Sequence, residues 1–95
     1  MALSYVYILA SSDRRKLLAG LTSMIRETVW RSKQEEGEDA VRLVHLETYD
    51  QPAQAVARSD ELQLLSHEDL SSLVSQKNPD WRDLSDGWFD RQACE

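Results

Sequence analysis

Hydrophobic positions along the chain form separate groups, and the first two predict a pair of strands. Tyr5 to Ala10 (YVYILA) is rich in aromatic and branched residues, as in a largely buried strand. Lys16 to Leu21 (KLLAGL) is a second short apolar run, separated from the first by a polar connection. The two runs are close enough to form a hairpin. Gly20 inside the second run indicates a bulge or a close approach of another group to the backbone.

The next groups predict a helix followed by a third strand. Ile25, Val29 and Trp30 can share one side of a helix that runs to about Glu36, with Thr22 or Ser23 as its N-cap. An acidic break containing a glycine, QEEGEDA, follows at 34–40. Val41 to Tyr49 (VRLVHLETY) then has the partial alternation of a strand, carried by Val41, Leu43, Val44 and Leu46.

Two further helices are predicted in the second half. Asp50 is a candidate N-cap with Pro52 in the first turn, and the helix continues through Val56 and Leu62 to about Leu65. The segment 66–69 (SHED) resembles a capping box and opens a last helix, which Asn78-Pro79 ends. The order β-β-α-β-α-α predicts an α/β (α+β) domain in which helices flank a three-stranded antiparallel sheet.

Composition narrows the class of protein. A chain of 95 residues predicts one domain with a thin core. Neither a signal peptide nor a membrane span is visible in the sequence. The single cysteine, Cys94, has no partner in the chain, so we expect a reducing, cytoplasmic compartment. The net charge of −6 argues against a nucleic-acid partner unless a local basic patch exists.

Several segments together resemble the GIY-YIG nuclease family, in particular its small, stand-alone bacterial branch. The similar segments are YVYILAS at 5–11, LAGLT at 18–22, RLVHLETYDQPAQAVAR at 42–58 and NPDWRDL at 78–84. Their order and spacing fit the branch over nearly the whole chain, to about Leu84. The resemblance therefore implies a GIY-YIG-like domain at 1–84 and a C-terminal tail at 85–95 that can be flexible.

The resemblance also implies where a catalytic site would lie. In the family, a glutamate on the second helix holds a divalent metal, an arginine on the first helix offsets developing charge, and two tyrosines serve the attacking water. The first tyrosine is present as Tyr7. The second tyrosine, the arginine and the glutamate fall on Leu18, Thr28 and Ser59. These four are vestigial positions, and we expect no catalytic, cofactor-binding or metal-binding residue.

A relocated site is the alternative. Asp60 or Glu61 could supply a carboxylate, and Arg26 or Arg31 a cation, which would make the chain a divergent endonuclease using Mg²⁺ or Mn²⁺. Adjacent helical positions point about 100° apart, so these side chains are expected to leave the face of the site.

The segments that would approach DNA in the branch are changed as well. The loop at 34–39 (QEEGED) and the linker at 63–69 (QLLSHED) are neutral or acidic here, which removes attraction for a polyanion. The remaining basic cluster, Arg14-Arg15-Lys16, is expected to be a solvated hairpin tip. We therefore expect a catalytically inactive domain that binds a protein partner or its own copies, as an interaction or regulatory module.

Other aromatic and histidine residues have structural interpretations. Trp30 is expected in the core and Trp81 as a fastener of the tail, while His45 is expected to be half-buried or at the surface and His67 at the surface. Trp88-Phe89 lies beyond the resemblance. It fits a disordered end, a clasp onto its own domain, or an exposed hook for a partner equally well.

Overall fold

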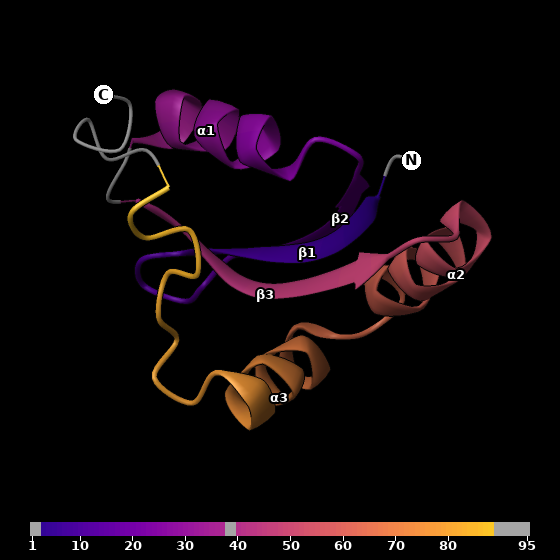
Figure 1. The fold of residues 1–95 in the computed structure, drawn as a ribbon. Coiled ribbons are helices and arrows are strands. Elements are labelled where there is room, and N and C mark those ends of the chain that lie inside the picture. Colours follow the sequence, from indigo (N-terminus) through magenta and orange to yellow (C-terminus); the bar gives the residue numbers. More distant parts are fainter. Residues whose placement is uncertain (1–2, 38–39, 89–95) are drawn as a thin grey trace.

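The computed structural model describes residues 3–37 and 40–88 and contains one sheet of three antiparallel strands. The elements are β1 (Ser4–Ser11), β2 (Leu17–Thr22), α1 (Ile25–Glu36), β3 (Val41–Tyr49), α2 (Pro52–Gln63) and α3 (His67–Lys77). The spatial order is β2-β1-β3, so the first strand is central. Helix α1 lies on one side of the sheet and α3 on the other (Figure 1). The predicted α+β class, the three-stranded antiparallel sheet and the order of elements are confirmed.

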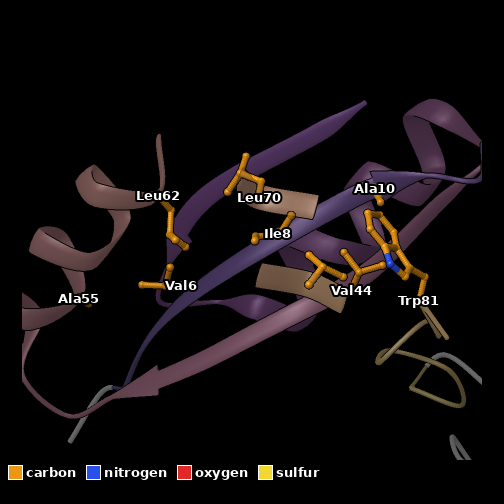
Figure 2. Close-up of a cluster of buried hydrophobic side chains, with 9 residues drawn as sticks. Val6, Ile8, Ala10, Val44, Ala55, Leu62, Leu70 and Trp81 are labelled. Carbon is orange, nitrogen blue, oxygen red and sulfur yellow. The ribbon is translucent and has the colours of Figure 1, made fainter. Parts of the chain in front are cut away.

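The central strand β1 separates two hydrophobic cores. Figure 2 shows the core on the α2/α3 side, where Val6, Ile8 and Ala10 meet residues of both helices. Tyr7 and Leu9 alternate with them and belong to the α1-side core. That core is completed by Ile25, Val29, Val41 and Leu43. Burial on both faces explains why β1 is almost continuously apolar.

Strand β3 supplies residues to both cores and contains a bulge. Ile8 is opposite His45, but Leu9 is opposite Leu43, so Val44 is an extra residue between the two pairs. Leu43 enters the α1-side core, whereas Val44 enters the α2/α3-side core. The bulge explains why apolar and polar residues alternate only incompletely in the sequence of this strand.

The N-caps of α1 and α2 differ from the predictions, whereas the N-cap of α3 agrees. The N-cap of α1 is Met24, and Thr22 belongs to β2, where its hydroxyl accepts a hydrogen bond from the Met24 amide at 3.0 Å. The N-cap of α2 is Gln51, without a side-chain bond, so Asp50 is not the cap. Ser66 does cap α3, since its hydroxyl accepts from the Asp69 amide at 3.1 Å.

The prediction that Trp30 lies in the core was wrong. Trp30 is 51% exposed, because the buried stripe of α1 is Ile25, Val29 and Lys33, and position 30 is one step off that stripe. Similarly, α2 buries Ala55, Ser59 and Leu62, while Val56 is 46% exposed. In each helix one position of the buried stripe is polar. A prediction based on apolar residues alone therefore misplaces the stripe.

The NPDWRDL segment closes the outer edge of β3. Asn78 donates from Nδ2 to the Val44 carbonyl at 3.1 Å, and the Leu84 amide donates to the Leu43 carbonyl at 2.7 Å. Trp81 is buried and its Nε1 donates to Ser75 Oγ at 3.0 Å, which confirms the predicted fastening role. Beyond this segment Ser85 is also buried, and Trp88 packs against the α1-side core. Phe89 and Cys94 lie outside the described residues.

In the part of the chain that the structure describes, every helix is too short and too polar to cross a bilayer.

Candidate functional site

Three of the four vestigial positions share the α1 side of the sheet. Tyr7 of β1 is opposite Gly20 of β2, and Leu18 lies two residues before that glycine on the same face. Thr28 of α1 is joined to this area through Thr22, since the two hydroxyl oxygens are 2.9 Å apart. Because α1 packs mainly over β3, the β2 half of this face is less covered, and Leu18 is 60% exposed. We call Tyr7, Leu18, Thr22 and Thr28 the β2 face.

The β2 face presents hydroxyl groups and one apolar side chain. Its hydroxyls come from Tyr7 and from two threonines already bound to each other. Burial raises the pKa of Tyr7 above its ordinary value of 10.0, so the phenol stays protonated near neutral pH and is a poor base. Leu18 offers neither a proton nor a hydrogen bond.

The ring of Tyr7 lies so close to the backbone at position 20 that only glycine fits there. A Cβ at position 20 would lie 2.4 Å from Tyr7 Oη and 2.5 Å from Cζ, which is inside van der Waals contact. The close approach predicted for this glycine is therefore confirmed, and the group that approaches is the phenol. The pair fixes the ring of Tyr7 against β2 as framework.

We expect Gly20→Ala to lower the free energy of unfolding by about 1–3 kcal/mol, because the added methyl overpacks the site. The same change in a Tyr7→Ala background should cost much less, since the overlapping ring is gone. Chemical denaturation of the two single variants and the double variant measures this coupling. Equal losses in both backgrounds would contradict the contact.

Ser59 lies on a different side of the molecule from the other three positions. It belongs to the buried stripe of α2, between Ala55 and Leu62 of the α2/α3-side core, and is only 3% exposed. Its hydroxyl is bound by Gln63 Nε2 at 3.2 Å. The position that would hold the metal is thus a buried neutral group whose oxygen already has a hydrogen-bond partner.

The candidate replacement acids are on the solvent side of α2. Asp60 and Glu61 are both exposed, and Glu61 is paired with Arg58 one turn earlier. Among residues 3–37 and 40–88, no three His, Cys, Asp or Glu side chains converge as a metal site would require. Arg26 and Arg31 are also exposed, and Arg26 donates to the Trp88 carbonyl at 2.7 Å.

A partly buried polar network between β3 and α2 was not anticipated from the sequence. Glu47 on β3 accepts from Tyr49 Oη at 2.6 Å and from Arg58 Nε at 3.0 and 3.1 Å, and it lies 2.7 Å from His45 Nε2. His45 is 3% exposed, so the expectation of a half-buried or surface residue was wrong. The alternation of His45, Glu47 and Tyr49 on one strand, with an arginine on the next helix, was the available signal.

The network controls the ionisation of Glu47. Burial alone would raise its pKa, but the hydrogen bonds from Arg58, Tyr49 and His45 outweigh that effect and lower the pKa to about 2. All described hydrogen-bond partners of the Glu47 carboxylate are side chains of this chain. One of them, Arg58, also bonds to Glu61. We interpret the network as a structural tie between β3 and α2.

Acid should therefore remove stability through Glu47. The folded pKa of about 2 is below the ordinary 4.5, so this stabilisation is present above pH 4.5 and is lost as the pH falls toward 2. Discounted for partial solvent exposure, it is on the order of 1–2 kcal/mol. Urea unfolding between pH 6 and pH 2.5 should show a smaller loss for Glu47→Gln than for the native chain. Parallel curves for the two proteins would contradict the assignment.

The basic cluster lies at the hairpin between β1 and β2, as predicted. Arg15 and Lys16 are exposed, Arg15 is near Asp13 at 3.8 Å, and Arg14 stacks over the Trp81 ring. His67 is exposed, as expected, with Nε2 3.1 Å from the Arg14 carbonyl. These contacts engage Arg14 and Arg15 with neighbouring groups at the turn.

Comparisons of the chain with models of protein families, with curated proteins and with solved structures find no match. The resemblance to the GIY-YIG family accordingly depends on the quoted segments.

Proposed function

We propose that this chain is a catalytically inactive GIY-YIG-like domain that acts as a protein-interaction or regulatory module. The observation that carries the proposal is the burial and hydrogen bonding of Ser59, at the position where the family places its metal ligand. A buried hydroxyl held by Gln63 cannot serve as the sole protein ligand of a hard divalent cation, which prefers carboxylate oxygens.

The β2 face supports the same proposal. An exposed leucine, a protonated phenol and a threonine pair supply no positive charge to stabilise the pentavalent phosphate of the transition state. An exposed leucine beside a sheet edge is instead suited to burial against another polypeptide. The acidic composition also disfavours binding of a polyanion.

Titration calorimetry with Mg²⁺ and Mn²⁺ tests the proposal against the divergent-endonuclease alternative. We expect no binding up to millimolar metal, because Asp60 and Glu61 are exposed and do not converge with a third ligand. Binding that disappears in Asp60→Asn or Glu61→Gln would contradict the proposal. Glu68→Gln, which changes an exposed acid at the start of α3, is the matched control.

A DNA-binding assay at low salt distinguishes a further class of function. A nucleic-acid binder without cleavage would show affinity that falls steeply with salt concentration. We expect no shift of duplex, single-stranded or branched DNA at low ionic strength. A salt-sensitive shift that is lost when Arg15 and Lys16 are replaced by serine would contradict the proposed protein partner.

A further inference from the structure

The two outer edges of the sheet differ in how far their backbone groups are hydrogen-bonded. The outer edge of β3 is occupied, since Leu43, Val44 and Val41 all bond to groups from outside the sheet. The donors and acceptors are Leu84, Asp83, Asn78 and Lys33. In the described residues, the outer edge of β2 has no comparable backbone partner. An open edge of this kind is a template for another strand.

Strand β2 also lacks the features that usually protect an open edge. Its sequence, LLAGLT, contains no charged residue and no proline, and its pairing with β1 has no bulge. Leu18, Leu21 and Met24 are 60%, 38% and 53% exposed in or just after the strand. Hollows lie on both sides of the edge, one lined by Leu18 with Ser32 and Glu35, the other by Leu18 with Gln63 and Leu65.

We propose that the edge of β2 is a self-association surface, at which a second copy of this chain adds its own β2 antiparallel to the first. This inference rests on the proposed function and names the partner. Two three-stranded sheets would join into one continuous sheet around a two-fold axis perpendicular to it.

The register follows from the alternation of backbone groups. The Ser11 amide donates to the Lys16 carbonyl at 3.0 Å, so Lys16 directs its backbone groups toward β1. Successive residues alternate in an antiparallel sheet, and Leu17, Ala19 and Leu21 therefore direct theirs outward. A two-fold axis at Ala19 pairs Ala19 with itself and Leu17 with the partner's Leu21. In this register the outward-directed backbone N–H and C=O groups of β2 all find partners on the second copy of β2.

Side chains are compatible with that register on both faces. Leu18 comes to lie opposite the partner's Gly20, where it meets the Tyr7 ring that covers that glycine. Leu17 and the partner's Leu21 share the opposite face. Lys16, which directly precedes β2, also comes near the end of the partner strand, where the first turn of α1 contains the exposed Glu27. Lys16 and Glu27 give the pairing opposite charges in each half of the interface.

Sedimentation velocity from micromolar to near-millimolar protein tests the location of the interface. We expect a concentration-dependent dimer that Leu18→Lys weakens at least tenfold, with an unchanged circular dichroism spectrum. Leu84→Lys puts the same charge at the opposite side of the sheet and should leave the dimer intact. A monomer at all concentrations, or equal effects of both variants, would overturn the inference.

Disulfide trapping tests the register without relying on a destabilising charge. In a Cys94→Ser background, Ala19→Cys should form a linked dimer, because hydrogen-bonded antiparallel partners have Cα atoms about 5.5 Å apart. Leu17→Cys, which is not opposite itself, should link much more slowly. Equal rates would overturn the register. A monomeric chain that also binds no metal would leave the proposed function standing with a different partner, whereas metal-dependent cleavage would contradict that function in either oligomeric state.

Discussion

Replacing Asp83 with alanine is expected to lower the free energy of unfolding by up to about 3–5 kcal/mol, the range for fully buried ion pairs that lose one member. The Asp83 carboxylate accepts from Lys33 Nζ at 2.6 Å, from the Leu43 amide at 3.1 Å, and from both the amide and hydroxyl of Ser85. Lys33 has a side chain only 8% exposed, so the variant leaves its cation without a counter-charge.

The surroundings of Asp83 also predict an asymmetry between the two partners. Burial would raise the pKa of Asp83, but the bonds from Lys33, Ser85 and Leu43 together lower it. Lys33→Met leaves the carboxylate with three donors, so its loss should be smaller than that of Asp83→Ala. Urea denaturation measures both losses, with the exposed Asp80→Ala as a control expected within about 0.5 kcal/mol. A loss below about 1 kcal/mol for Asp83→Ala would contradict the role of this pair.

Replacing Trp81 with alanine is expected to cost about 3–5 kcal/mol, the range for a buried large aromatic residue. Trp81 is 4% exposed, contributes to the α2/α3-side core and donates from its indole to Ser75. Its φ of 53° lies in the left-handed region, so packing holds a conformation that a tryptophan rarely adopts. The alanine variant keeps the unfavourable backbone and loses the packing.

The chain provides a matched control for Trp81. Trp30 is half exposed on α1, so Trp30→Ala should change the free energy of unfolding far less. Thermal unfolding followed by circular dichroism compares the two. Equal destabilisation would mean that the NPDWRDL segment is not the fastening element described above.

Local sequence predicted the elements of the fold because it determines their ends and their period. The apolar run of β1, the proline at the start of α2 and the Ser66 cap are short-range signals, and the corresponding elements were confirmed. The edge closure by Asn78 and Asp83 was not visible, since it joins residues at least 34 positions apart along the chain.

Polar residues inside the domain account for most of the errors. Lys33 and Ser59 occupy buried stripes although both residue types are usually at the surface, and His45 is buried within a partly buried polar network. The partner of Lys33, Asp83, is 50 positions away and meets it only in the folded chain, whereas Gln63 and Glu47 are four and two positions from Ser59 and His45. The candidate site was located by resemblance, and only three of its four positions share one face of the sheet.

The most direct test of the central claim is a cleavage assay with purified protein. Branched, single-stranded and duplex DNA would be incubated with the chain in Mg²⁺ or Mn²⁺, alongside Tyr7→Phe, which retains the ring over Gly20 and removes the only phenol of the β2 face. We predict no cleavage above the background without protein for either chain. Metal-dependent cleavage by the native chain that Tyr7→Phe abolishes would contradict the claim that this domain no longer cuts.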